Sequence, residues 1–120
     1  MRVLIVDDSA IVRERLKDML SEVMGVENIS QAKNSPEAIS SFQKLNPEVV
    51  ILDIRMPGGS GIEVLQKIKK SNQPPLVIVL TNYPYPQYRR KCIEAGADFF
   101  FNKSTEFEKV TEVLKQFSQN

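Results

Sequence analysis

The sequence predicts an α/β domain, a five-stranded parallel sheet with helices on both faces. Three short runs are apolar without alternation and rich in β-branched residues, namely residues 3–6, 49–52 and 76–80. Strands that are covered on both faces of a parallel sheet have this composition. Residues 26–32 and 98–102 form two weaker strand candidates. Each interval between these runs has room for one helix, as in right-handed βα crossovers.

Apolar residues at helical spacing define the first and the last helix. The first is predicted to bury Val12, Leu16, Met19, Leu20 and Val23. The last is predicted to bury Phe107, Val110, Val113, Leu114 and Phe117. Residues three or four positions apart lie on one side of a helix, so each helix offers one face to the sheet.

The helix of the second interval has signals at both ends. Ser35 and Pro36 supply an N-cap and a first-turn proline, and Asn46-Pro47 ends the helix. Its apolar residues are Ala38, Ile39, Phe42 and Leu45. The helix of the third interval is marked by Ile62, Leu65 and Ile68.

The helix of the fourth interval has the weakest pattern. Pro84 and Pro86 delay its start, and residues 89–91 are a basic run. The residues left to face a core are Tyr88, Cys92, Ile93 and Ala95. We expect this helix to be short and comparatively mobile.

Composition and charge favour one domain that spans residues 1–120. Sixteen Lys and Arg residues oppose fifteen Asp and Glu residues, for a net charge of +1. This balance gives no electrostatic basis for direct binding to nucleic acid or to an anionic membrane. No apolar run approaches the ~18 residues of a membrane span. We therefore expect a cytoplasmic protein.

The chain contains no histidine and one cysteine, Cys92. A Ser-His-Asp triad, a Cys-His pair and a histidine-ligated zinc ion are therefore impossible. A single cysteine forms no internal disulfide, which agrees with a reducing compartment. Any chemistry must use carboxylates, hydroxyls, lysine or a metal ion.

Polar residues follow four of the five strand candidates. They are Asp7 and Asp8 after the first, Asp53 after the third, Thr81 after the fourth and Lys103 after the fifth. Ligands of open parallel sheets bind beyond the carboxyl ends of the strands. Each residue alone has an ordinary interpretation as a turn former, a helix cap or a surface charge. Their joint occurrence at one sheet edge favours a functional site there.

The residue types of this site indicate phosphoryl chemistry. Three carboxylates at one edge repel one another unless a cation neutralises them. Oxygen ligands without His or Cys favour a hard cation, and a small cluster that leaves coordination sites open to water or phosphate suits Mg²⁺ better than Ca²⁺. Lys103 adds an ammonium group and Thr81 adds a hydroxyl, which suits the handling of a phosphoryl group.

These residues give the chain a resemblance to the receiver domain of bacterial two-component response regulators, of the chemotaxis-regulator-like type, over residues 2 to about 118. The motifs that carry the resemblance are Asp7-Asp8, residues 52–58 with Gly61 beyond them, Thr81, residues 94–97 and Lys103. The resemblance implies a flavodoxin-like doubly wound sheet with strand order 2-1-3-4-5.

The resemblance also implies roles for the site residues. Asp53 would accept the phosphoryl group of a phosphohistidine on a sensor histidine kinase or phosphotransfer protein, or that of a small phosphodonor. Mg²⁺ would be held by Asp8, Asp53 and the backbone carbonyl of Arg55, with Asp7 acting mainly through a bound water. Lys103 would pair with phosphoryl oxygens. Such a domain is no classical enzyme, since it catalyses only its own phosphoryl transfer and autodephosphorylation.

In this family, signalling follows from movement of the threonine and of an aromatic residue three positions before the lysine. The resemblance therefore implies that Thr81 and Phe100 move. The movement would repack the face formed by the fourth helix, fifth strand and fifth helix, which carries the basic run 89–91. This face would contact a downstream protein or a fused effector domain, or form a phosphorylation-dependent homodimer. A solvated basic face is the alternative interpretation.

The chain departs from the family pattern in three places. Ser104 follows Lys103 where the family usually has a proline after a cis peptide bond, and Asn82 follows Thr81 where a small residue is common. In this family, the positions that Arg55 and Tyr83 occupy influence how long the phosphoryl group survives.

Two other functions stay open from the sequence. One is an interaction module with this fold that is never phosphorylated. The other is a phosphatase with an aspartate nucleophile and Mg²⁺, although Asp7-Asp8-Ser9 lacks the second Asp two residues after a nucleophile that such enzymes commonly have. A flavin or nucleotide site is disfavoured because no Gly-rich loop follows the first strand.

Overall fold

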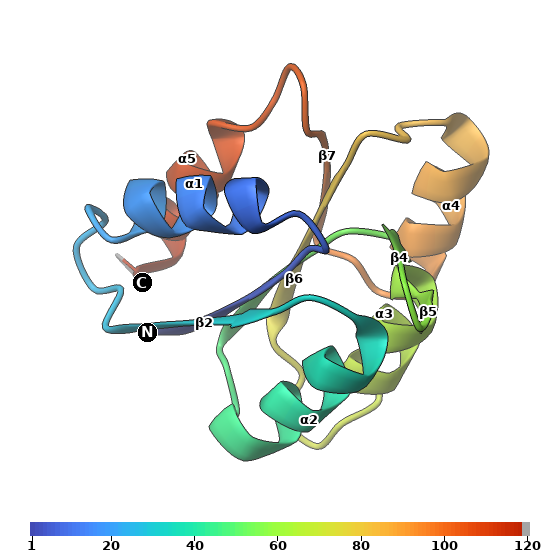
Figure 1. The fold of residues 1–120 in the computed structure, drawn as a ribbon, viewed down its shortest axis with the longest axis horizontal. Helices are drawn as coiled ribbons and strands as arrows, with labels where there is room; N and C mark the ends of the chain where they lie inside the picture. The colour runs from blue at the N-terminus through green and yellow to red at the C-terminus, as the bar shows by residue number, and fades with distance from the viewer. Residues whose placement is uncertain (119–120) are drawn as a thin grey trace.

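The computed structural model describes residues 1–118 and contains a five-stranded parallel sheet of the predicted kind (Figure 1). Its strands are β1 (Arg2–Val6), β2 (Asn28–Ala32), β3 (Val49–Leu52), β6 (Leu76–Thr81) and β7 (Phe99–Asn102). The order across the sheet is β2-β1-β3-β6-β7. Counted along the chain among these five strands, that order is the expected flavodoxin-like one, and all four strand pairs are parallel.

In the described part of the chain, five helices cover the sheet on both faces. They are α1 (Ala10–Leu20), α2 (Ser35–Leu45), α3 (Gly61–Lys69), α4 (Pro86–Glu94) and α5 (Lys109–Ser118). Figure 1 shows α1 and α5 together on one side and α2, α3 and α4 on the other. Within residues 1–118, no helix combines the length and apolar character that crossing a membrane requires.

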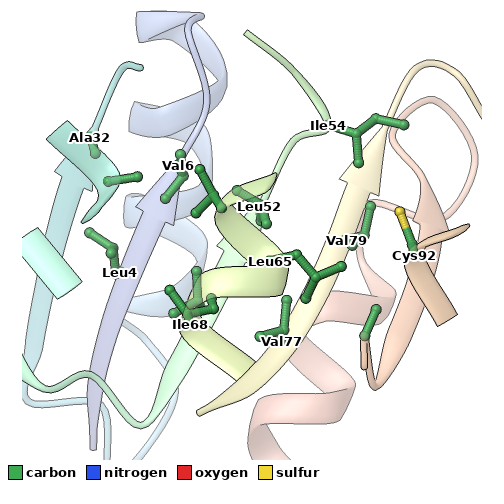
Figure 2. Packing of buried hydrophobic residues seen from close by; sticks show 14 of the residues in the cluster. Leu4, Val6, Ala32, Leu52, Ile54, Leu65, Ile68, Val77, Val79 and Cys92 are labelled. Atoms are coloured by element: carbon green, nitrogen blue, oxygen red, sulfur yellow. The ribbon is translucent and has the colours of Figure 1, made fainter. Parts of the chain in front are cut away.

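Alternation along the strands divides the core into two layers. Leu4 and Val6 of β1 pack towards α2, α3 and α4, whereas Val3 and Ile5 pack towards α1 and α5. Successive side chains of a strand point to opposite faces, so continuous apolar runs feed both layers. Figure 2 shows the first layer, in which Leu65 and Ile68 of α3 lie over the sheet. Full burial of each such side chain contributes roughly 2 kcal/mol of transfer free energy.

The start of α2 differs from the prediction. Asn34, not Ser35, is the N-cap, and its Oδ1 accepts a hydrogen bond of 2.9 Å from the Glu37 amide. Ser35 is instead the first helical residue, is buried, and donates its hydroxyl to the Gly59 carbonyl at 3.1 Å. Both residue types cap helices well, so the sequence signal allows either position.

The first and last helices do not include every apolar residue that the spacing assigned to them. Val23 and Phe107 are buried as expected, but they lie just outside α1 and α5. Phe117 remains 36% exposed at the end of α5. Apolar residues next to a helix end thus reach the core through turns, which periodicity alone does not distinguish from helix.

The short helix α4 agrees with the prediction in length but not in every core residue. Cys92 is fully buried, and Tyr88 and Ala95 pack against the same layer. Ile93 is 46% exposed, so its predicted place in the core is wrong. It follows Cys92 directly and is therefore turned by about 100° around the helix axis. The mobility of α4 stays a prediction.

A small hairpin replaces the loop expected after β3. β4 (Arg55–Met56) and β5 (Gly59–Ser60) pair antiparallel around Pro57 and Gly58. Gly58 has a φ of 83°, in the region that favours glycine. A Cβ on Gly58 would lie 3.0 Å from the ring of Pro36, so the hairpin tip sits tightly on the start of α2.

Candidate functional site

The structure brings the polar strand-end residues to one edge of the sheet. Asp7 and Asp8 follow β1, Asp53 follows β3, Thr81 ends β6, and Lys103 follows β7. These four strands are neighbours in the sheet. Residues that are far apart in the chain therefore meet beyond the carboxyl ends of the strands, where α/β proteins bind ligands.

Three carboxylates form the centre of the site. One oxygen from each of Asp7, Asp8 and Asp53 lies within 4.8 Å of the other two. Asp7 and Asp53 are only 2% and 6% exposed, whereas Asp8 is open to solvent. This donor set consists of carboxylate oxygens, one of them accessible, and therefore fits a hard cation such as Mg²⁺.

Lys103 bridges the two buried carboxylates. Its Nζ donates to Asp7 Oδ2 at 2.6 Å and to Asp53 Oδ2 at 3.1 Å. Burial lowers the pKa of Lys103, but its hydrogen bonds to Asp7 and Asp53 and their charges outweigh this effect and hold the pKa above its ordinary value. The site therefore favours the positively charged form of Lys103.

Asp53 lies in an environment that disfavours its negative charge. Burial raises the pKa of Asp53, Lys103 lowers it, and the nearby charge of Asp7 raises it again, which leaves it above the ordinary value. One ammonium group does not neutralise three carboxylates. The excess negative charge is an electrostatic reason for a second cation to bind here.

Asp7 is held by hydrogen bonds at four atoms. Its Oδ1 accepts from the Ser9 amide at 2.9 Å, and its Oδ2 accepts from Lys103. Its amide donates to the Ala32 carbonyl, and its carbonyl accepts from Arg13 Nη1 at 2.7 Å. Arg13 is not predicted from the sequence, since an arginine inside an amphipathic helix carries no signal of a site.

Asp53 is positioned by its own main chain and by Gly61. Its amide donates to the Val6 carbonyl at 3.0 Å, and its Oδ1 accepts from the Ile54 amide at 2.8 Å. A Cβ on Gly61 would overlap the Asp53 carbonyl and lie 2.7 Å from the Ile54 Cα. Position 61 therefore requires glycine, because the backbone of Asp53 and Ile54 comes too close for a side chain.

Thr81 is fully buried at the end of β6. Its hydroxyl accepts a hydrogen bond of 3.0 Å from the Tyr83 amide, and its carbonyl accepts one of 2.8 Å from the Lys103 amide. The second bond ties the chain at Thr81 to Lys103. The hydroxyl also keeps its own proton for donation.

Phe100 is the buried member of the run Phe99 to Phe101. It is 6% exposed and packs with α2, α3 and α4, while Phe99 and Phe101 pack with α1 and α5. The guanidinium of Arg89 donates to the Phe100 carbonyl at 3.4 Å and lies 5.7 Å from the ring centre. Phe100 thus has a direct contact with the exposed basic run on α4.

The departures from the family pattern have defined contacts. The Lys103–Ser104 peptide bond is trans. The Ser104 hydroxyl donates to Asn82 Oδ1 at 3.4 Å, so these two unusual residues contact each other. The guanidinium of Arg55 lies 4.4 Å from the centre of the Tyr83 ring.

Comparison with known proteins agrees with this fold. Residues 3–115 match the family model described as the response regulator receiver domain. The chain belongs to this family, the receiver domains of two-component signalling systems.

Two curated relatives come from Thermotoga maritima. The chemotaxis protein CheY is 35% identical over 118 residues, covering 98% of this chain and 98% of its own length. A cyclic di-GMP phosphodiesterase is 39% identical over 119 residues, covering 96% of this chain but 31% of its own length. The chain spans about a third to a half of the length of several other curated relatives that it matches.

A solved structure of a response regulator domain is also similar to this chain. The response regulator domain of Thermotoga maritima CheB is 32% identical, and the match covers 99% of this chain and 93% of that one with a TM-score of 0.84. Receiver domains thus occur both nearly alone, as in CheY, and joined to further segments.

Proposed function

We propose that this domain is a phosphoacceptor switch in which Asp53 receives the phosphoryl group. The observation that carries the proposal is the buried Asp53 carboxylate in a three-carboxylate cluster, bridged to Asp7 by Lys103. One Asp53 oxygen attacks phosphorus, the bond from phosphorus to the donor nitrogen or oxygen breaks, and an acyl phosphate forms. The leaving group departs with the bonding electron pair.

The other residues of the site would position the phosphoryl group and neutralise its negative charge. Asp8, Asp53 and the backbone carbonyl of Arg55 would hold Mg²⁺, with Asp7 acting through a water. When bound, Mg²⁺ offsets negative charge on the phosphoryl oxygens. Lys103 pairs with one phosphoryl oxygen, and Thr81 donates its hydroxyl to another. The domain catalyses only its own phosphorylation and autodephosphorylation.

The conformational effect of phosphorylation is proposed to be transmitted through Thr81 and Phe100. A hydroxyl that turns towards the phosphoryl group vacates its place near the Tyr83 amide, and Phe100 repacks beneath Arg89. The face of α4, β7 and α5 would then contact a downstream protein, a fused effector or a second copy. The proposed phosphodonor is a sensor histidine kinase or a phosphotransfer protein.

The test is the intact mass of the protein after exposure to a small phosphodonor. Wild type, Asp53→Asn and Asp18→Asn are compared with Mg²⁺ and with a chelator. Asp18 is an exposed aspartate of α1 outside the cluster and serves as the matched control. One phosphoryl adduct that requires both Mg²⁺ and Asp53, and that persists in Asp18→Asn, is expected.

A phosphorylated kinase provides the second arm of this test. Failure of folded wild type to gain an adduct from the small donor and from the kinase would overturn the proposal. The protein would then be an interaction module that is not phosphorylated. Repeated turnover of a phosphate ester would instead favour the phosphatase.

A further inference from the structure

Arg13 connects α1 to β2 and to the chain just after β1, beside the carboxylate cluster. It lies one turn into α1, where its Nη1 donates to the Asp7 carbonyl at 2.7 Å and its Nε donates to Gln31 Oε1 on β2 at 3.0 Å. The guanidinium is planar and presents its donors in a fixed fork. One hydrogen bond anchors the guanidinium to β2 and the other holds the Asp7 carbonyl just after β1, so together they fix the direction of that carbonyl.

The direction of the Asp7 carbonyl determines the placement of Asp8. The peptide group between Asp7 and Asp8 is planar, so turning its carbonyl also moves the Asp8 amide and Cα. The Asp8 carboxylate is exposed, and among residues 1–118 no side chain forms an ion pair with it. Unlike Asp7, whose carboxylate is held by Ser9 and Lys103, Asp8 depends on its main chain for orientation.

We propose that Arg13 is a positioning residue that orients the Asp7–Asp8 peptide group and thereby sets the affinity of the three-carboxylate cluster for a divalent cation. The proposal rests on the proposed function, which assigns that cluster to Mg²⁺. Groups that hold metal ligands in place typically change metal affinity by roughly 10- to 100-fold when they are removed.

Electrostatics alone predicts the opposite effect of removing Arg13. A positive charge beside the cluster repels a cation, so its loss strengthens cation binding if charge is the only contribution. Loss of the two hydrogen bonds weakens binding by loosening Asp8. The sign of the change in affinity therefore separates the two causes.

The experiment compares Arg13→Gln, Arg13→Lys and Gln31→Met with wild type by Mg²⁺ calorimetry on the full chain. Arg15→Gln is the matched control, because Arg15 lies on the same helix but packs over the Phe107 ring at 4.0 Å. We expect the Mg²⁺ dissociation constant to rise about tenfold in Arg13→Gln. Smaller rises are expected in Arg13→Lys, which keeps the charge without the fork, and in Gln31→Met. Arg15→Gln is expected to match wild type or to bind more tightly.

A second readout needs no metal ion. The amide nitrogen of Asp8 belongs to the peptide group that Arg13 holds, so its NMR signal in metal-free protein is expected to shift in Arg13→Gln and not in Arg15→Gln. Thermal unfolding of each variant shows that the compared proteins are folded.

An Arg13→Gln affinity equal to or tighter than that of wild type would overturn the proposal, as would an unmoved Asp8 signal. A wild-type protein that takes up no Mg²⁺ would instead contradict the proposed function. In that case, the Asp8 signal still decides whether Arg13 orients the peptide group.

Discussion

The guanidinium of Arg55 packs on the face of the Tyr83 ring, 4.4 Å from its centre. Arg55 follows Asp53 by two positions, and Tyr83 follows Thr81 by two. The contact therefore joins the segment after the proposed phosphoacceptor to the segment after the proposed hydroxyl donor. Tyr83 also lies 6.5 Å from the Tyr85 ring at the start of α4, so the contact connects the edge of the site to that helix.

Removing either partner of this contact is expected to shorten the life of phosphorylated Asp53. An exposed cation–π contact contributes about 0.5–1 kcal/mol. If that stabilisation protects the phosphorylated state and is lost in the transition state, decay in Arg55→Ala or Tyr83→Ala is roughly two- to fivefold faster. The measurement is the loss of the adduct by intact mass over time, with Arg90→Ala on α4 as the control. Unchanged decay in both variants would refute the role of this contact.

Asp53→Asn is expected to stabilise the protein when Mg²⁺ is absent. The substitution removes a buried carboxylate whose pKa is raised by burial and by Asp7, with Lys103 only partly offsetting both. A gain of about 1 kcal/mol is expected, a usual size for a single-residue effect. Thermal unfolding in chelator measures it, with Asp18→Asn as the exposed control. A lower melting temperature for Asp53→Asn would contradict the inferred repulsion.

The stability gain of Asp53→Asn depends on pH in a defined direction. Because the pKa of Asp53 is higher in the folded protein than in the unfolded chain, ionised Asp53 destabilises the fold at neutral pH. This cost disappears as the pH falls through the raised pKa towards the unfolded value. The difference in stability between Asp53→Asn and wild type is therefore expected to shrink on acidification, and a difference that grows would overturn this reasoning.

Gly61→Ala is expected to impair the site as well as the fold. A Cβ at this position overlaps the Asp53 carbonyl, so the chain around the proposed phosphoacceptor must move. A cost of roughly 1–3 kcal/mol is typical of forced overpacking. Adduct formation at Asp53 is expected to fall as well.

The matched control for Gly61 is Gly96→Ala. Gly96 has a φ of 106° and packs against Lys69, away from the carboxylates, so alanine there also destabilises the fold. If both variants lose stability but only Gly61→Ala loses adduct formation, Gly61 positions Asp53. Equal loss of adduct formation in both would show that stability alone matters.

Cys92 is expected to be unreactive in the native protein. Burial raises the pKa of its thiol to about 11. At about pH 8 a free cysteine is partly thiolate, the form that reacts, whereas this thiol stays protonated and enclosed. A thiol reagent is expected to modify the protein only when denaturant is added. Rapid modification of folded protein would contradict this prediction and would indicate that α4 opens readily.

Local patterns in the sequence were sufficient to predict the sheet and the edge at which the site lies. Apolar runs such as 76–80 define buried strands because their residues must fill both layers. The parallel topology then brings together Asp7, Asp53 and Lys103, since each follows a strand and the carboxyl ends of parallel strands meet. The assignment of Ile93 to the core failed because a pattern of four apolar residues does not tell which side of a short helix meets the sheet.

The contacts within the site depend on distances between elements that are remote in the chain. Lys103 and Asp7 are 96 positions apart, yet their side chains form the shortest hydrogen bond of the cluster. Arg13 reaches the Asp7 carbonyl and Gln31 only because α1 packs across β1 and β2. Residue types and strand ends in the sequence therefore indicate which groups can do the chemistry. The packing of helices on the sheet decides which of them touch, because hydrogen bonds act over only about 3 Å.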